Sequence, residues 1–320
     1  MNLRPGTLRV CIRLGICIRL LVVNSRGKFR LKLHSRTLVL GKRTLIMGVL
    51  NVTPDSFSDG GNFSSPEKAV QRALQMEREG ADIIDVGGES TRPGSAGVSA
   101  EEEWMRLAPV LAALRTRLKI PISIDTRKSE IATKAVESGV ELINDVSGLK
   151  HDARVAEVAA RARVALVLMH MRGEPETMQQ KPFARDVVKD VVRGLRESVG
   201  MARKAGVGDS RIVLDPGIGF GKSYAQNYEL LGKLSEVAAL GFPLLVGTSR
   251  KGFIGKALEL DGKLASAEAK LWGTAGTVAA SILNGAHIVR VHDVREMVSV
   301  ARVADCILDS RLAPRNGVAL

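Results

Sequence analysis

The chain has 320 residues, of which 45% are apolar and 25% charged, and with only seven Phe, two Tyr and two Trp its core must be aliphatic. This composition is typical of a globular protein and excludes a low-complexity chain. The formal net charge of +13 suggests a nucleic-acid partner. Residues 1–44, however, hold eleven Lys and Arg and no acid, and the remainder is nearly neutral, with 36 basic and 34 acidic residues. This uneven distribution argues against a nucleic-acid partner.

We expect no membrane anchor in the basic segment at the start of the chain. Its apolar stretch VCIRLGICIRLLVV is interrupted by Arg13 and Arg19, and its β-branched run disfavours the amphipathic helix of an organelle transit peptide. We expect residues 1–28 to be a basic N-terminal extension, disordered or an artefact of the gene model. Residues 29–320 are then expected to form a single barrel domain.

Cysteine usage indicates a reducing compartment. Cys11 and Cys17 lie in the basic segment and Cys306 lies near the C-terminus, so no disulfide framework and no metal-ligand spacing follows. We therefore expect a cytoplasmic protein that has neither nucleic acid nor a membrane as its partner.

From residue 44 onward, short apolar runs alternate with helix-length amphipathic stretches. The eight runs predict strands at 44–52, 82–89, 121–126, 142–147, 165–171, 212–217, 243–249 and 287–293. Between them, Pro66 after a Ser N-cap begins a helix that Gly80 ends, and Ser99 with Glu102 is typical of a capping box. Further helices are predicted at 129–138, 151–162, 185–204, 225–239, 266–283 and 294–309. Eight strand–helix units over ~250 residues favour an α/β fold, a single (β/α)8 TIM barrel with a basic N-terminal extension, over a doubly wound open sheet.

Polar side chains recur where the predicted strands end. These are Asn51, Asp85, Glu89, Asp125, Asn144, His170, Asp215, Ser249, Arg290 and His292. Because the carboxyl ends of barrel strands converge on the face where active sites are built, we expect a common site there. The alternative is that these groups satisfy one another, for example by pairing Asp125 with Arg127 or Lys251. Two long loops, VTPDSFSDGG and STRPGSAGVS, follow the first two strands and are candidate lids.

Eight segments of the chain resemble the dihydropteroate synthase family. They are GVLNVTPDSFSDGG, GADIIDVGGESTRPG, SIDT, INDVSG, LMHMRG, DPGIGFGK, GTSRKGFIG and VRVHDV, which stand in the family's order over about residues 44–295. The resemblance implies a transferase of folate biosynthesis that condenses 6-hydroxymethyl-7,8-dihydropterin diphosphate with p-aminobenzoate to 7,8-dihydropteroate and pyrophosphate. It also implies Mg²⁺ as cofactor, a homodimer, and sulfonamides as competitors of p-aminobenzoate.

The resemblance also assigns roles to individual residues. Asn51 is the implied Mg²⁺ ligand, and catalysis falls to Arg92, Asp125, Lys251 and Arg290. The implied pterin and diphosphate site consists of Thr91, Asp125, Asn144, Met169, Asp215, Phe220, Lys251, Arg290 and His292. The implied p-aminobenzoate pocket consists of Phe57, Thr91, Arg92, Pro93, Phe220, Ser249 and Lys251.

Several neighbouring residues receive no role in the site. His170 is expected to be a satisfied strand-end histidine, Arg127 and Arg250 to form ion pairs only, and Asp85 and Glu89 to structure a loop.

The segment DPGIGFGKS resembles a nucleotide-binding loop only superficially. A Walker A motif needs Gly where Pro216 stands, so the glycines are expected instead to let the backbone approach a ligand beside Asp215. Three other functions stay open: a methyltetrahydrofolate methyltransferase serving a corrinoid protein, an aldolase with Lys251 as Schiff-base residue, and a binding module whose basic segment contacts nucleic acid.

Overall fold

The computed structural model describes residues 26–53, 65–90, 97–173, 178, 184–259 and 262–310 of the chain. Phe57, Thr91, Arg92 and Pro93, which were predicted to lie in the site, are outside the described residues, as is most of the predicted extension, residues 1–25.

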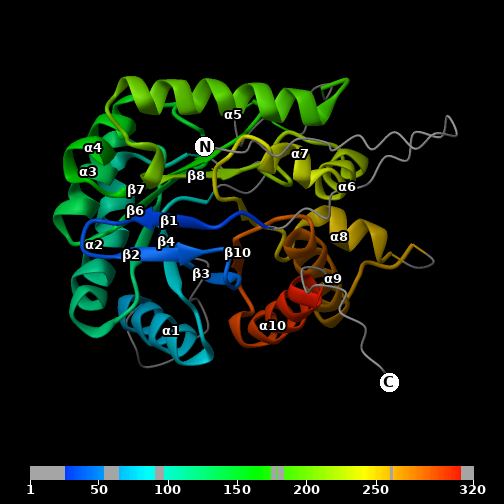
Figure 1. The fold of residues 1–320 in the computed structure, drawn as a ribbon. Coiled ribbons are helices and arrows are strands. Elements are labelled where there is room, and N and C mark those ends of the chain that lie inside the picture. The colour runs from blue at the N-terminus through cyan, green and yellow to red at the C-terminus, as the bar shows by residue number, and fades with distance from the viewer. Residues whose placement is uncertain are drawn as a thin grey trace, which may run out of the picture.

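Eight parallel strands in the described part of the chain form the centre of the molecule (Figure 1). They are β3 (Leu45–Asn51), β4 (Ile83–Gly87), β5 (Ile122–Asp125), β6 (Leu142–Asp145), β7 (Ala165–Met169), β8 (Ile212–Asp215), β9 (Leu245–Val246) and β10 (Ile288–Val291). The hydrogen-bonded order is β8-β7-β6-β5-β4-β3-β10-β9, and a bridge between Leu214 and Leu244 joins the two outer strands. The sheet thus closes into the predicted (β/α)8 barrel.

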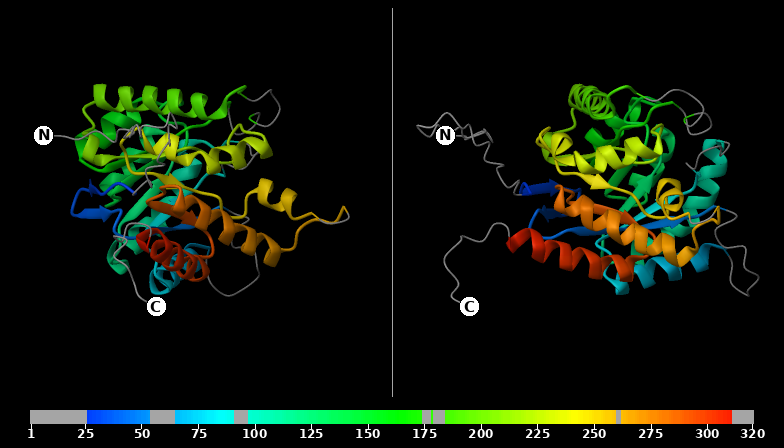
Figure 2. Two further views of the ribbon diagram at one scale, coloured as in Figure 1. Left: turned by 45° about the vertical axis from the view of Figure 1, so that its right-hand side comes forward. Right: turned by 90° about the vertical axis from the view of Figure 1, so that its right-hand side faces the viewer.

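Helices surround the strands (Figures 1 and 2). They are α1 (Ser65–Glu79), α2 (Ala100–Arg117), α3 (Ser129–Glu137), α4 (Arg154–Ala162), α5 (Val187–Lys204), α6 (Tyr224–Gly232), α7 (Leu234–Ala238), α8 (Gly252–Ala257), α9 (Ala267–Leu283) and α10 (Val294–Ser310), with a short 3₁₀ turn at Asp209–Arg211. The predicted helix at 225–239 is divided into α6 and α7 at Lys233, and α8 was not predicted. Within the described ranges, no helix is both long and apolar enough to cross a lipid bilayer.

Helix ends follow the expected local chemistry. Ser99 caps α2, because its side-chain oxygen accepts the N–H of Glu102 at 3.1 Å. This is one half of the predicted capping box, and the Glu102 side chain accepts a hydrogen bond from Arg106. A reciprocal capping box is present at α6, where Ser223 accepts the N–H of Gln226 and the Gln226 side chain accepts the N–H of Ser223.

An antiparallel hairpin closes the amino-terminal end of the barrel. It consists of β1 (Phe29–Lys32) and β2 (Thr37–Leu40), and the views in Figure 2 show it in blue at one end of the strands. Leu31 and Leu40 are buried against the interior side chains that lie nearest the starts of the barrel strands. The predicted strands began at residue 44 and omitted this hairpin. Arg26, which falls in the predicted extension, also contacts the barrel through Asp305 at 3.0 Å.

Side-chain alternation separates two apolar layers. One cluster fills the space between strands and helices, and a second one lies inside the barrel. The inner positions start as aliphatic residues, such as Ile83, Leu142, Val213 and Ile288. Two residues further along the same strands, the same face carries Asp85, Asn144, Asp215 and Arg290, because successive side chains of a strand point to opposite faces.

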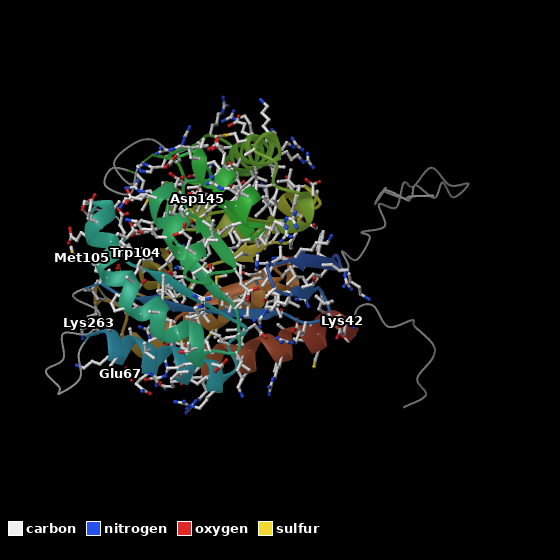
Figure 3. All side chains as sticks on the ribbon, turned by 90° about the vertical axis from the view of Figure 1, so that its left-hand side faces the viewer. Lys42, Glu67, Trp104, Met105, Asp145 and Lys263 are labelled. Carbon is white, nitrogen blue, oxygen red and sulfur yellow. The ribbon has the colours of Figure 1, made fainter. Side chains whose placement is uncertain are left out.

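The two ends of the barrel are easily found in Figure 3. Glu67 of α1, Met105 of α2 and Lys263 before α9 lie at one end, and Lys42 between β2 and β3 lies toward the other. The first end is where the strands finish, called the mouth below. The second is where they start, called the base.

Candidate active site

Arg290 lies at the centre of the mouth. Its Nε donates to Asp85 Oδ2 at 2.6 Å and its Nη2 donates to Asp125 Oδ2 at 2.7 Å. Burial alone would lower the pKa of Arg290, but the charges of Asp85 and Asp125 outweigh burial and raise it above its ordinary value. The site therefore contains a permanent, precisely oriented cation. Asp125 pairs with Arg290 and not with Arg127 or Lys251, so that alternative pairing was wrong.

Asp85 was expected to structure a loop, and that expectation was wrong. It lies inside β4, is fully buried, and its Oδ2 accepts both Arg290 and the Asn144 Nδ2 at 3.0 Å. Alternation from Ile83 through Asp85 to Gly87 could have placed this carboxylate inside the barrel. Asp85 thus orients the cation and the amide of the mouth at once.

Three buried polar atoms in the barrel interior have no hydrogen-bond partner among the described residues. They are Asp85 Oδ1, Ser123 Oγ and Asp125 Oδ1. An unpaired buried polar atom costs about 1–3 kcal/mol, so a folded protein tolerates such a cluster where a ligand or water completes it. Burial raises the pKa of Asp125 to about 7, with Arg290 opposing and Asp85 reinforcing the shift. This arrangement can bind a partner rich in hydrogen-bond donors.

Asp215 and Lys251 form the opposite wall of the mouth. Asp215 Oδ1 accepts the Gly217 N–H at 2.7 Å, and burial raises the pKa of Asp215, although Lys251 opposes the shift. Lys251 Nζ donates to the Ile218 carbonyl and lies 4.6 Å from the centre of the Phe220 ring. Burial lowers the pKa of Lys251 to about 8. This lysine is therefore a hydrogen-bond donor held against an aromatic face.

The loop glycine beside Lys251 is required by a close approach. Gly219 has φ +85°, and a Cβ there would lie 2.9 Å from the Lys251 Cδ. The group approached at Gly219 is a side chain of the protein itself, and the expected approach of these glycines to a ligand beside Asp215 stays a prediction.

Apolar side chains lie next to the polar wall. Val146, Met169, Met171 and Met178 form a small buried cluster, against which Phe220 packs. Met169 is paired with Asp215 in the β7–β8 register, so an apolar and an acidic side chain stand side by side at the mouth. A flat heterocycle with a polar edge fits such a surface.

Ser249 and His292 contact each other at the ends of β9 and β10. The Ser249 Oγ accepts the His292 N–H at 3.2 Å and lies 3.0 Å from the ring Nδ1. Arg250 next to them donates from Nε to Asp293 at 3.0 Å, an ion pair as predicted.

Asn51 ends β3 beside Gly87 of β4. Its Oδ1 and the Asp125 Oδ2 would lie 3.7 and 3.8 Å from a Cβ added at Gly87, so the amide and the carboxylate share one space above this glycine. No group of three or more His, Cys, Asp or Glu side chains in the described ranges could hold a metal ion by itself.

His170 and Glu89 lie outside this arrangement, as expected. His170 is buried beside Lys222, with its Nδ1 3.2 Å from the Lys222 Nζ. Glu89 binds Lys128 at 2.8 Å and Arg127 at 3.4 Å, which fixes the start of the second loop. The structure thus brings together Asn51, Asp125, Asn144, Met169, Asp215, Phe220, Ser249, Lys251, Arg290 and His292 at one end of one barrel.

Comparison with known proteins agrees with this geometry. The family model described as "Pterin binding enzyme" matches residues 47–292. The chain is 47% identical over 267 residues to the dihydropteroate synthase of Synechocystis sp., covering 83% of this chain and 91% of that protein. The chain belongs to the dihydropteroate synthase family of pterin-binding enzymes.

Two solved dihydropteroate synthases are similar in fold, and each is 40% identical to this chain in sequence. The Xanthomonas albilineans protein with 4-aminobenzoic acid has a TM-score of 0.80 and covers 90% of this chain and 100% of its own. The Yersinia pestis protein in a sulfonamide drug complex has a TM-score of 0.79 and covers 89% and 100%.

Membership of the dihydropteroate synthase family confirms the predicted reaction. The enzyme is a transferase that condenses 6-hydroxymethyl-7,8-dihydropterin diphosphate with p-aminobenzoate and releases pyrophosphate. The corrinoid methyltransferase, the aldolase and the non-enzymatic binding module are thereby set aside.

Proposed function

We propose that the mouth residues have three roles in the synthase reaction: some bind the pterin, some stabilise the departing diphosphate, and some bind p-aminobenzoate. The observation that carries this proposal is that Asp125 holds the Arg290 guanidinium with its Oδ2 and keeps its Oδ1 buried without a partner among the described residues. A cation suits the anionic diphosphate end of the substrate, and a free carboxylate oxygen suits the N–H donors of the pterin end.

The pterin is proposed to lie between Asp125, Asn144 and Asp215. The aminopyrimidinone edge of a pterin presents N–H donors, which pair with carboxylate and amide oxygens. Met169 and Phe220 offer it apolar contact, and Lys251 offers a donor to its acceptor atoms. Support comes from the register that sets Asp125 beside Asn144 and Met169 beside Asp215.

The diphosphate is proposed to bind Arg290 and His292. Carbon–oxygen cleavage leaves negative charge on the departing diphosphate and positive charge on the pterin methylene, so a fixed cation at the leaving group stabilises the transition state. Arg290 suits this role because its guanidinium is held by two carboxylates and does not need to reorganise.

Asn51 is proposed to give Mg²⁺ one oxygen ligand. Mg²⁺ binds proteins through few side-chain oxygens and completes its shell with substrate phosphates and water, which fits a mouth that offers an amide and no metal cluster of its own among the described residues. When bound, the ion supplies neutralising charge to the diphosphate. Reaction rates with and without Mg²⁺, in the enzyme and in Asn51→Ala, test this ligand.

The second substrate is proposed to enter over Lys251, Phe220 and Ser249. Phe57, Thr91, Arg92 and Pro93 of the two long loops would complete this pocket. The aniline nitrogen attacks the pterin methylene as the carbon–oxygen bond breaks, and it then loses one proton. Sulfonamides, which the Yersinia pestis relative binds, would compete for the same pocket.

A homodimer is proposed through α9 and α10. From Leu271 to its end, α9 has no charged residue, and Trp272 is 67% exposed. Val303, 62% exposed, lies on α10, which packs beside α9 (Figure 1). An apolar surface of this kind is typical of subunit interfaces. Light scattering of the enzyme and of Trp272→Glu tests the assignment, and a monomeric parent enzyme would contradict it.

We also propose that the enzyme works in the cytoplasm, since its described cysteine, Cys306, is free. The decisive test of the overall proposal is pyrophosphate release by purified enzyme with both substrates. Release that requires p-aminobenzoate supports it. Release that is unchanged in Asp125→Asn and Arg290→Met would show that the residue roles are wrong.

A further inference from the structure

Lys222 is one of the largest almost completely buried side chains among the described residues, with 2% exposure. It follows the loop 217–221, and in a nucleotide-binding loop a lysine after glycine would point at phosphate. Here its Nζ points into the protein. It donates to the carbonyls of Gly217 at 2.8 Å, Phe220 at 3.0 Å and His170 at 3.2 Å, and it lies 3.2 Å from the His170 Nδ1.

The loop that Lys222 binds has few other ways to keep its shape. Gly217, Gly219 and Gly221 all have positive φ, at +68°, +85° and +62°. Three glycines in five residues make a loop that loses much conformational entropy on ordering. The Lys222 Nζ joins both halves of this loop to the end of β7. Burial lowers the pKa of Lys222 to about 7, with Asp215 opposing the shift, and the charged form has three protons for these bonds.

His170 extends the same cluster to helix α5. Its Nδ1 lies 3.2 Å from the Lys222 Nζ, and its Nε2 lies 3.6 Å from the Asp190 Oδ2. Burial and the nearby lysines hold the pKa of His170 far below its usual range, which keeps the ring neutral. Gly194 makes room for it, because a Cβ there would lie 2.6 Å from the ring Cδ2.

The same loop supplies three contacts of the active site. The Gly217 N–H binds Asp215, the Ile218 carbonyl binds Lys251, and the Phe220 ring lies beneath the Lys251 ammonium. Each of these contacts comes from a residue between Asp215 and Lys222. A shift of this backbone would therefore displace the acid, the cation and the aromatic face together.

We propose that Lys222 is a positioning residue of the synthase: by binding the carbonyls of Gly217, Phe220 and His170 it fixes the loop 217–221, and through it the places of Asp215, Phe220 and Lys251. The proposal rests on the roles proposed above for these three residues. Lys222 itself does not touch substrate.

The base of the barrel offers a matched control. Arg211 Nη1 donates to three carbonyls, those of Lys32 at 3.0 Å, Leu33 at 2.9 Å and Arg163. Arg211 thus also binds three carbonyls with one side chain, but at the base, away from the residues of the mouth. Loss of this cation should cost stability and leave the mouth unchanged.

The experiment compares Lys222→Met, Lys222→Gln and Arg211→Met in the full chain. We expect Lys222→Met to raise the KM for pterin diphosphate and to lower kcat by about tenfold each, since misplacement of site groups by ~1 Å can cost far more. Lys222→Gln keeps N–H donors and should lie between Met and the parent. Arg211→Met should lower Tm with unchanged KM and kcat.

Unchanged KM and kcat in the Lys222 variants, with a Tm loss like that of Arg211→Met, would overturn the proposal and leave Lys222 a purely structural residue. Failure of both Lys222 variants to fold would overturn it in the same way. Asp215→Ala separates this result from a failure of the proposed site: if it too leaves the KM for pterin diphosphate unchanged, the residue roles at the mouth are at fault instead.

Discussion

The base and the mouth of the barrel both bury charged groups, but they treat them differently. At the base, Asp305 binds the Arg26 guanidinium at 3.0 Å, the Thr44 N–H at 2.7 Å and the Thr44 hydroxyl at 2.8 Å. His287 accepts the Leu244 N–H at 3.1 Å and donates from Nε2 to the Gly27 carbonyl at 2.9 Å. Among the described residues of this network, only the Arg26 Nε is buried without a partner.

At the mouth, carboxylate oxygens are left over. Asp85 and Asp125 each use one oxygen for Arg290 and keep the other buried without a partner among the described residues. Burial raises the pKa of Asp125 to about 7 and lowers that of Lys251 to about 8.

The difference indicates where the fold gains stability and where it keeps binding capacity. A satisfied charge network holds the structure, because its loss leaves buried groups uncompensated. An incompletely satisfied network is costly by itself and becomes favourable when a ligand completes it. Substitutions at the base should therefore change stability, and substitutions at the mouth should change catalysis first.

Replacement of Arg290 should produce the largest effect on catalysis. We expect Arg290→Met to lower kcat/KM by about 10³-fold, since removal of one preorganised donor to a developing anion already costs 10²–10³-fold. Steady-state pyrophosphate release measures the change. The control is Arg26→Met at the base, which should lower Tm with kcat/KM unchanged. Equal losses of activity in both variants would abolish the distinction between the two ends.

Two strand-end aspartates at the mouth should differ in their effects. Asp215→Ala should raise the KM for pterin diphosphate by about 10²-fold, because the ring donors lose a charged acceptor. Asp145, labelled in Figure 3, is satisfied by Ser147 and Leu149, whose N–H groups lie at 2.8 and 2.7 Å. Asp145→Asn should thus destabilise the enzyme and leave that KM unchanged. A raised KM for Asp145→Asn, or none for Asp215→Ala, would contradict this division.

The pH dependence of catalysis should follow Asp125. Its carboxylate accepts pterin donors only when ionised, so kcat/KM should rise with pH up to a plateau above the pKa of about 7, by nearly tenfold per pH unit on the acid side. Asp125→Asn should be weakly active and should lack this rise of kcat/KM with pH.

The stability of the unliganded enzyme should show the opposite trend with pH. Because folding raises this pKa, the contribution of Asp125 is fully present below pH ~3.8 and is lost as the pH rises through 7.

His287 at the base should make the free energy of unfolding depend on pH in the opposite direction to Asp125. Burial lowers its pKa to about 4, so the unfolded chain binds a proton between pH 4 and pH ~6.5 that the folded chain does not bind. Its contribution is therefore present above pH ~6.5 and falls by about 1.4 kcal/mol per pH unit as the pH drops toward 4. Unfolding titrations of the enzyme and of His287→Gln should differ by this slope, with catalysis unaffected. Parallel pH curves for the two proteins would contradict the assignment.

The barrel could be predicted from the sequence because its signal is local and repeated. Each predicted strand overlaps an observed strand, since buried parallel strands are continuous apolar runs. The β1–β2 hairpin was missed because it stands before the repeat and carries Arg30 and Lys32 on its exposed side. Helix α8 was missed because GFIGKA is only six residues long and contains two glycines.

Site prediction failed where burial and pairing decided the role. Asp85 and Asp125 carry the same side chain near the ends of neighbouring strands, and only the structure shows that one orients Arg290 and Asn144 from a fully buried position. From the sequence, Lys222 was considered only as part of the segment DPGIGFGKS, which does not match a nucleotide-binding motif. The local sequence does not determine the direction in which a long side chain points. The alternation of side chains along β4 could have predicted that Asp85 points into the barrel, but no local sequence pattern could have predicted the contacts of Lys222.

The smallest effect that we predict is a gain at the base. Arg163 ends α4 in the left-handed conformation, at φ +55°, where a residue with a Cβ is strained by about 1–2 kcal/mol. Arg163→Gly should stabilise the enzyme by about 1 kcal/mol, a rise of a few degrees in Tm, with KM and kcat unchanged. Arg163→Ala is the matched control, since it removes the charge near Arg211 but keeps the strained Cβ. An equal rise in Tm for both variants would mean that repulsion between Arg163 and Arg211, rather than backbone strain, limits stability at this end of the barrel.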